Sequence, residues 1–366
     1  MLRSINKQVC ITSAKAVCIL SAALAAVLLT GCAPRVATSF WRIGTPADST
    51  REGYAVIHAE GKTRHCYPIT EWSDMPEVDT YHQLHHHGVA VESELMAYRI
   101  YFDKKQTIDP YCKRKPQLEL AQSYWYPNDS LLAAGYGDDI LRVSGTVGVG
   151  SVKYWNGKKM VHIEPVAERS QRIVQSKRDQ ATIEVAVKGW QIEDKMVNMV
   201  TQYTMRAGHR DLRCDVSTSE PVEGLCTGVQ TIPAKGNLTD VVDLTAKRSY
   251  SDNGLIAKGG RCAFVAQLKN GILLASWGTD WPVNDSAKYA KETVGLGVFI
   301  PKAFAGECVH DKQNNMCLLH LTAKRPEMCR AHFYLTCCGA TKENHPVATS
   351  AEEWFAYLRR WASRLK

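Results

Sequence analysis

The sequence lacks the short motifs that identify several enzyme classes. Its 366 residues contain no GxSxG nucleophile elbow, no HExxH zinc motif, no phosphate-binding P-loop and no credible dinucleotide fingerprint. The 13 cysteines include no CxxC pair, so neither a zinc ribbon nor a thioredoxin-like redox centre has support. We therefore predict no cofactor, and any chemistry must come from side chains that are dispersed along the chain.

Concentrated charge is also missing. The chain has 45 basic and 37 acidic residues, a formal net charge of +8. Three basic residues and no acidic one lie in residues 1–31, so the remainder carries a net charge of +5. No basic stripe of the kind that nucleic-acid-binding proteins use is present, and we expect no nucleic-acid partner. The mild positive charge suits an anionic ligand such as a uronic acid.

The N-terminus has the pattern of an export signal. A basic start precedes an apolar run, Val17–Leu29, that is shorter than the about 20 residues of a membrane-spanning helix. The run ends in "LLTGC", which resembles the lipobox of bacterial lipoproteins. We predict a signal peptide over residues 1–31 and lipidation of Cys32. The alternative is an ordinary secretory signal that is cleaved nearby, without an anchor.

The residues after Cys32 carry no acidic cluster of the kind that some lipoproteins use as a surface-export tag. This favours the periplasmic face of an outer membrane, with membrane contact through the lipid anchor only. We assign residues 32–51 to the lipidated cysteine and a tether, and 52–366 to a single domain. In such an oxidising compartment we expect some of the remaining cysteines to pair, in a connectivity that spacing does not reveal.

Short strands dominate the predicted domain. "LRVSGTVGVG" (Leu141–Gly150) and "TIEVAVKGW" (Thr182–Trp190) alternate apolar and other residues with the period of a half-buried strand. Asn156-Gly157 and Asn270-Gly271 lie between apolar runs and predict hairpin turns. The absence of internal repeats of 20–50 residues argues against propellers and solenoids.

A clear helix is predicted at the C-terminus. Ser350 and Glu353 form a capping-box pattern, and Trp354, Leu358 and Trp361 fall on one stripe. Together with the strands, this predicts a mainly β fold, a large antiparallel β-sandwich with a C-terminal α-helix.

The segment "ELMAYRIYFD" (Glu94–Asp103) predicts a strand with two chemically different faces. One face is apolar and should enter the core. The other face is either solvated or forms the wall of a sugar-binding cleft, in which Arg99 would bind a carboxylate bidentately. The two sets are Met96, Tyr98, Ile100 and Phe102 on the core face, and Arg99, Tyr101 and Asp103 on the other.

Four histidines precede this strand, at positions 82, 85, 86 and 87. In an extended backbone His85 and His87 would share a side, with His86 opposite. Two imidazoles could begin a zinc site if His162 or Glu164 of "VHIEP" supplied a third ligand. The alternatives are a metal-free acid/base pair and a solvated loop. We predict no metal site and retain a divalent metal as an alternative.

Two further clusters could bind ligand. "YTMRAGHRDLRCDV" contains His209 and Arg210, and a charged hairpin tip with local ion pairs is the alternative there. "SWGTDWPVNDSAKYAKETVGLGVFIP" carries Asp280, Trp281 and Lys291 in a loop before a strand. Sugars stack their apolar faces on Trp and hydrogen-bond to charged side chains, so this loop suits a saccharide.

Four segments in order resemble a bacterial family known as domain of unknown function 4861. They are "HHHGVAVESELMAYRIYF", "YGDDILRVSGTVGVG", "HIEPV" and "SWGTDWPVNDS...KETVGLGVFIP". The resemblance covers roughly residues 52 to 366. It implies a galactose-mutarotase-like β-supersandwich and an exported component of polysaccharide utilisation, often of pectin, without assigning a reaction.

We therefore hypothesise an enzyme that acts on acidic, pectin-type oligosaccharides by general acid/base chemistry, as a lyase or a glycoside hydrolase. In elimination, His86 or His162 would take the uronate C5 proton, Arg99 or Arg210 would neutralise its carboxylate, and Tyr101 would protonate the leaving oxygen. In hydrolysis, Glu164 would act with Glu92 or Asp280. A non-catalytic glycan-binding lipoprotein and a sugar mutarotase or epimerase remain alternatives.

The predicted catalytic residues are His86, His162, Glu164 and Tyr101, and the predicted substrate-binding residues are Arg99, His87, His209, Arg210, Asp280, Trp281 and Lys291.

Overall fold

The structure is a computed structural model. It describes residues 35–59, 62–74, 80–123, 125–232, 241–243, 262–281, 289–311, 316–321 and 329–366. The predicted signal peptide and Cys32 lie outside the described residues. Residues 35–366 belong to one compact unit. Among the described residues, no helix combines the length and hydropathy that crossing a membrane would need.

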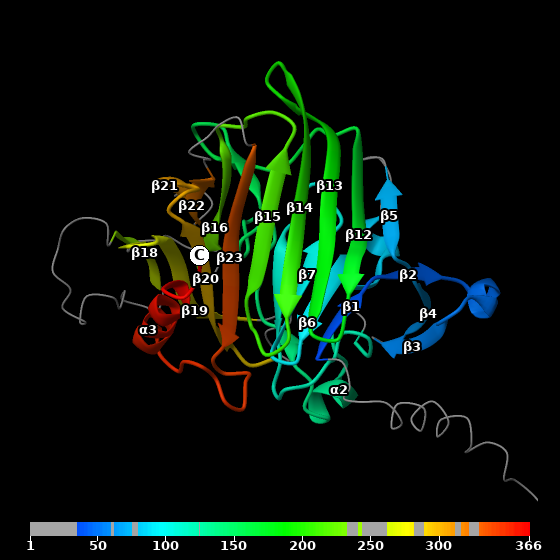
Figure 1. The fold of residues 1–366 in the computed structure, drawn as a ribbon. Helices are drawn as coiled ribbons and strands as arrows, with labels where there is room; N and C mark the ends of the chain where they lie inside the picture. The colour runs from blue at the N-terminus through cyan, green and yellow to red at the C-terminus, as the bar shows by residue number, and fades with distance from the viewer. Residues whose placement is uncertain are drawn as a thin grey trace, which may run out of the picture. The chain divides into compact units, whose positions relative to one another are not determined.

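The architecture is built on one large sheet, which confirms the prediction of a mainly β, antiparallel fold (Figure 1). β17 and β18 are parallel, and the other neighbouring pairs of this sheet are antiparallel. From edge to edge the strands are β17 (Val241–Asp243), β18 (Cys262–Leu268), β19 (Gly271–Asp280), β20 (Glu292–Pro301), β23 (Arg330–Gly339), β15 (Leu212–Thr218), β14 (Lys195–Arg206), β13 (Gln180–Ile192), β12 (Glu168–Ser176) and β5 (Glu71–Asp74).

Three smaller antiparallel sheets accompany it. The first contains β1 (Val36–Ser39), β6 (Gly88–Ser93), β7 (Met96–Tyr101), β8 (Ile108–Cys112) and β9 (Asp138–Asp139). The second contains β11 (Met160–Val161), β10 (Lys153–Trp155), β16 (Leu225–Gln230), β22 (Met316–Leu321) and β21 (Ala305–Asp311). The third contains β2 (Trp41–Gly44), β4 (Lys62–Pro68) and β3 (Ala55–Ala59). Short helical segments are η1 (Pro46–Thr50), η2 (Tyr81–Gln83), η3 (His85–His87) and α2 (Asp129–Ala133).

The main core lies between the large sheet and the two five-stranded sheets. β6 contacts β12, β13 and β14, while β16 contacts β19 and β20. Ile183, Val185 and Val187 of β13 are buried on one face, as the alternating pattern predicted. Burial of such alternating apolar faces is the dominant favourable contribution to folding, and it stacks the sheets into a sandwich.

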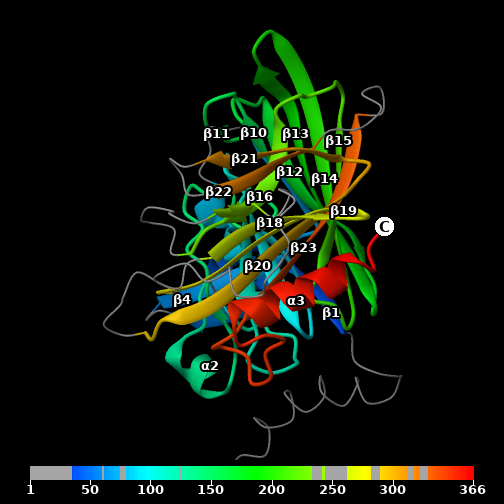
Figure 2. The same cartoon turned by 90° about the vertical axis from the view of Figure 1, so that its left-hand side faces the viewer.

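The C-terminal helix α3 (Ala351–Ala362) covers β19 and β20 of the large sheet and confirms the predicted helix (Figure 2). Its predicted apolar stripe is buried. A Cβ on Gly295 of β20 would lie 2.6 Å from the Trp354 ring, so glycine at this position permits the close approach of the helix. The cap differs slightly from the expected box. Ser350 Oγ accepts from the Glu353 N–H, but the Glu353 carboxylate accepts from the backbone N–H of Thr349.

Two sequence predictions about the chain's course need correction. Residues 141–150 form turns instead of a strand, because Ser144, Gly148 and Gly150 adopt positive φ, although the valines of this segment are buried. The predicted tether is largely folded. β1, β2 and η1 lie within it, and Val36 and Phe40 are buried in the core.

The hairpin predictions are confirmed, one with a shifted turn. Asn156-Gly157 follows β10 and precedes β11, with Gly157 at φ 86°. β18 and β19 form a hairpin in which Leu268 pairs with Gly271, so the turn is Lys269-Asn270, one residue earlier than expected.

Candidate functional site

The β7–β8 hairpin organises the polar residues that could carry chemistry. Met96, Tyr98 and Ile100 of β7 enter the core as predicted. The opposite face is not solvated, because Arg99 is 1 % and Tyr101 is 7 % exposed. A charged side chain can be buried at this depth only when well-placed partners compensate its charge. The contacts of Arg99 therefore define the first part of the site.

Both terminal nitrogens of the Arg99 guanidinium are bound by groups of the protein itself. Its Nη2 lies 2.5 Å from Asp109 Oδ2 and 2.5 Å from Asp139 Oδ2, and its Nη1 donates to the Trp125 carbonyl. The Tyr101 hydroxyl donates to Asp109 Oδ2 over 2.5 Å. Arg99 is therefore not placed to bind a substrate carboxylate, and Tyr101 donates its proton internally, contrary to the roles predicted for them.

Asp109 and Asp139, here called the acid pair, share this buried environment. Burial raises the pKa of both carboxyl groups and is the largest cause for each. For Asp139, the charge of the adjacent Asp109 carboxylate raises the pKa further. Two carboxylates beside a single guanidinium retain an excess negative charge, which favours a protonated member of the pair.

The histidine run does not form an extended strand. η3 is a tight turn in which His86 has φ 58° and His87 has φ 60°, and all three of its imidazoles are buried. His86 is completely enclosed, and its Nε2 donates to the Leu120 carbonyl over 2.8 Å. Burial holds its pKa well below the usual value. A neutral, enclosed imidazole cannot reach a substrate, so this position does not support the catalytic role predicted for His86.

His87 lies between two aromatic rings, and the three residues are here called the aromatic stack. Its ring centroid is 3.9 Å from that of Tyr81 at 4° and 4.5 Å from that of Trp125 at 21°. Its Nδ1 lies 3.0 Å from the Tyr81 carbonyl, which only accepts, so Nδ1 carries the proton and Nε2 carries a lone pair. Burial lowers the pKa of His87 to about 3.

A second group of residues surrounds a buried lysine of β10. Lys153 is 0 % exposed, and its ammonium reaches three acceptors: the Lys105 carbonyl, Thr107 Oγ1 at 3.2 Å and His162 Nδ1 at 3.4 Å. Three acceptors match the three donors of an ammonium. Burial lowers the pKa of Lys153 to about 7.

His162 is a half-buried imidazole among cations. Burial, and then the charges of Lys153, Lys104, Lys105 and Arg169, lower its pKa to about 3. Arg169 Nη2 donates to the Ile163 carbonyl over 2.9 Å, and the exposed Glu164 lies 3.4 Å from Lys104. Lys104 therefore lies near both His162 and Glu164. Lys104, Lys105, Lys153, His162 and Arg169 are here called the basic cluster.

The β7–β8 turn separates the basic cluster from the aromatic stack. Asp103 Oδ1 accepts the backbone N–H groups of Lys105 at 2.8 Å and Gln106 at 3.1 Å, and this holds Gln106 at φ 45°. The Lys105 carbonyl of this turn accepts from Lys153, and Tyr101, just before the turn, meets the Tyr81 ring edge to face at 5.4 Å. The two clusters are therefore neighbours around one short turn.

The other residues predicted for the site contact groups outside the basic cluster and the aromatic stack. Arg210 Nη1 is 2.7 Å from Glu343 Oε1 in a largely buried ion pair, which leaves it unsuited to bind substrate. The exposed His209 pairs with Asp211 at 3.2 Å, which matches the hairpin-tip alternative. Glu92 is buried against Lys113 and two backbone N–H groups, so it is not available for hydrolysis.

Asp280, Trp281 and Lys291 lie where β19 ends and β20 begins. The Lys291 ammonium is 5.4 Å from the centroid of the Trp281 ring. Residues 282–288 of the predicted sugar-binding loop lie outside the described residues. The contacts seen in the described part of the chain do not join these three side chains to the basic cluster.

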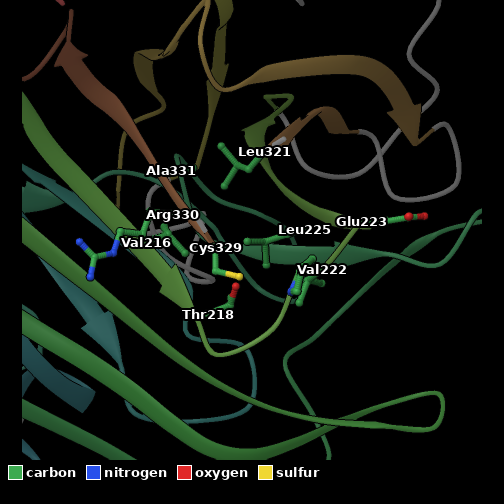
Figure 3. A pocket seen from close by; sticks show the side chains of 10 residues that line it. Val216, Thr218, Val222, Glu223, Leu225, Leu321, Cys329, Arg330 and Ala331 are labelled. Atoms are coloured by element: carbon green, nitrogen blue, oxygen red, sulfur yellow. The ribbon is translucent and has the colours of Figure 1, made fainter. Parts of the chain in front are cut away.

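A cavity of about 160 Å³ lies near the ends of β15, β16, β22 and β23 (Figure 3). Val216, Val222, Leu225 and Leu321 give it an apolar lining, with Glu223 at its edge. The residues predicted for the site do not line it. We place the candidate site at the β7–β8 turn, because the charged and imidazole groups gather there.

Sequence reasoning missed Lys153, Arg169 and both members of the acid pair. The sequence contains a signal for Asp139, because "YGDDI" places two aspartates directly before an apolar run. Lys153 gives a weaker signal, a single lysine in the alternating "SVKYW" segment, where an exposed position is the more common outcome.

These features define a mainly β sandwich protein in which a buried lysine contacts a half-buried histidine beside the β7–β8 hairpin. The chain belongs to the family described as Domain of unknown function (DUF4861), whose family model matches residues 44–366. The resemblance noted in the sequence is thereby confirmed. No curated protein matches the chain in sequence.

Two solved structures are similar over most of the chain. A glycosyl hydrolase family 38 protein from Enterococcus faecalis gives a TM-score of 0.37 at 8 % identity, covering 92 % of this chain and 41 % of that one. An alpha-mannosidase from Enterococcus faecalis V583 gives 0.36 at 8 % identity, covering 94 % and 41 %. This chain therefore spans about two fifths of their length, and a similarity this low supports no statement about activity.

The neutral state of the buried histidines predicts a specific acid sensitivity. His87 binds no proton in the folded protein until about pH 3 but binds one near pH 6.5 when unfolded. The unfolded state thus binds more protons between these values, so the free energy of unfolding falls as the pH falls through this window. We expect His87→Gln to reduce the slope between pH 6 and pH 4 by about 1.4 kcal/mol per pH unit.

Urea denaturation at a series of pH values measures this slope. The exposed His345 provides a matched control, His345→Gln, for the loss of an imidazole without the stack. An equal slope in wild type and His87→Gln would show that His87 is not held neutral.

Proposed function

We propose that this protein is a carbohydrate-active enzyme that cleaves acidic, uronate-containing oligosaccharides by β-elimination. The observation that supports this most strongly is the contact between Lys153 Nζ and His162 Nδ1 within the basic cluster. Three cations, Lys104, Lys105 and Arg169, and the two carboxylates of Asp103 and Glu164 surround this pair, which leaves a net positive charge to attract and neutralise a uronate carboxylate.

Lys153 and His162 can act together as one base. When Lys153 is neutral, its nitrogen lone pair accepts a hydrogen bond from the Nδ1–H of His162, so that the lone pair on Nε2 is free to take a proton. In the reaction the C5–H bond of the uronate breaks, its electron pair forms the enolate, and the proton moves to Nε2 while the Nδ1 proton moves to Lys153. A base with a pKa of about 7 is well matched to neutral pH.

The second half of the elimination releases the leaving group. The enolate electrons form the C4–C5 double bond as the C4–O bond breaks, and the leaving oxygen takes a proton from water. The cations of the basic cluster stabilise the charge that develops on the carboxylate in the enolate. Lys104, with a side chain 57 % exposed, is the member best placed to meet an incoming carboxylate.

Hydrolysis has less support from the same geometry. It needs two carboxyl groups on opposite sides of the scissile bond. Glu164 is exposed, but of the two partners proposed from the sequence, Glu92 is buried in an ion pair with Lys113. The contacts of the described residues do not join the other partner, Asp280, to the basic cluster. The basic cluster therefore suits elimination better.

The cellular setting that we propose comes from the N-terminal sequence. The chain would be exported, lipidated on Cys32 and held at the periplasmic face of an outer membrane, where pectin fragments would be its substrates. Labelled palmitate should be incorporated into the full chain expressed in a bacterial host and lost in Cys32→Ser. Equal incorporation in both would refute the anchor.

The elimination mechanism predicts a large effect of removing the buried amine. We expect Lys153→Met to lower the rate of product formation by about 10²–10⁴-fold, the usual contribution of a general base. Incubation with pectin-derived oligosaccharides, followed by the ultraviolet absorbance of the unsaturated uronate, measures it. The wild-type rate should rise with pH through about 7 as Lys153 loses its proton.

Lys188→Met is the matched control, because Lys188 is exposed and pairs with Glu168 on the large sheet. New reducing ends without the unsaturated product would contradict elimination and indicate hydrolysis. Binding without either product would indicate a glycan-binding protein instead.

A further inference from the structure

The aromatic stack and its surroundings form a surface of a different chemical character from the basic cluster. Tyr126 follows Trp125 directly and is 37 % exposed, and its ring centroid lies 5.8 Å from the guanidinium carbon of Arg99. The Tyr81 and Tyr101 rings meet edge to face at 5.4 Å beside His87. Aromatic faces, phenol groups and an imidazole lone pair therefore gather at this surface.

The charges near this surface have the opposite balance. Burial is the largest cause that raises the pKa of Tyr81, and the carboxylates of Asp103 and Asp109 add to it. Arg99 opposes them but is already neutralised by the acid pair. Arg64 also lies nearby, with its guanidinium carbon 5.4 Å from the Trp125 ring centroid. A carboxylate placed beside Tyr81 would face the Asp103 carboxylate and lose solvation, while the charge of Arg99 is already balanced by the acid pair.

A neutral sugar meets no such penalty. Its apolar ring face can stack on an aromatic ring, and its hydroxyl groups can donate to the lone pair on His87 Nε2 and exchange hydrogen bonds with the phenols. Pockets for small molecules commonly combine aromatic walls with a few oriented polar groups in this way.

The two surfaces adjoin at the β7–β8 turn. The Lys105 carbonyl of this turn accepts from Lys153, and Tyr101, just before it, meets the Tyr81 ring at 5.4 Å. We propose that the surface around Tyr81, His87 and Tyr126 binds a neutral sugar residue next to the uronate held by the basic cluster. The preferred substrate class is then an oligosaccharide in which uronate and neutral residues alternate. This inference rests on the proposed function and specifies its substrate.

The test compares two probes of equal length, an oligogalacturonide and an oligosaccharide of alternating galacturonate and rhamnose. Binding is measured by calorimetry at fixed ionic strength, because salt screens the basic cluster. We expect the alternating probe to bind at least about tenfold more tightly, and Tyr126→Ala to remove that preference. Tyr126→Phe keeps the ring and should retain it.

Met196→Ala, which truncates an exposed apolar side chain of β14, is the control for a generic surface change and should retain the preference. Equal affinity for the two probes, or a preference that survives Tyr126→Ala in protein with wild-type circular dichroism, would overturn the inference and leave the proposed function standing. Failure to bind or cleave either probe would overturn both.

Discussion

The candidate site depends on one interaction, the burial of the Lys153 ammonium against three acceptors. An ammonium without compensation in the interior would cost several kcal/mol, so the chain around it must deliver each acceptor accurately. The Lys105 carbonyl and Thr107 hydroxyl come from the turn between β7 and β8, and the imidazole of His162 comes from the segment after β11. Lys153 itself is on β10, in another sheet.

This arrangement explains why the sandwich architecture matters for the site. The turn belongs to the sheet of β6–β9, whereas β10 and β11 belong to the sheet of β16, β22 and β21. Both sheets pack on the large sheet, and the Lys153 side chain bridges them at their common boundary. Asp103 shapes the turn by accepting two backbone N–H groups, and its charge favours the protonated form of Lys153. The β7–β8 hairpin therefore positions the acceptors that hold Lys153. Its Asp103 carboxylate also contributes negative charge close to this lysine.

The sequence predicted the fold much better than it predicted the site. Alternation in β13 and the stripe of α3 report directly on burial, because each follows the period of its element. The segment at 141–150 failed because alternation alone does not reveal positive φ at Ser144. For the site, His162 and Glu164 could be predicted, since two polar residues flank the buried Ile163. Lys153, Asp109 and Arg169 could not, because whether a lone charged residue is buried depends on partners far away in the sequence.

The protonation state of Lys153 is the central claim of this account. Selective ¹³C labelling of the lysine side chains allows its Cε resonance to be followed by NMR through a pH titration, with Lys153→Met providing the assignment. The account predicts a titration near pH 7, because burial outweighs the attraction of Asp103. A midpoint near the ordinary lysine value of about 10.4 would contradict it. Such a lysine would stay charged at neutral pH and could not accept the proton from His162.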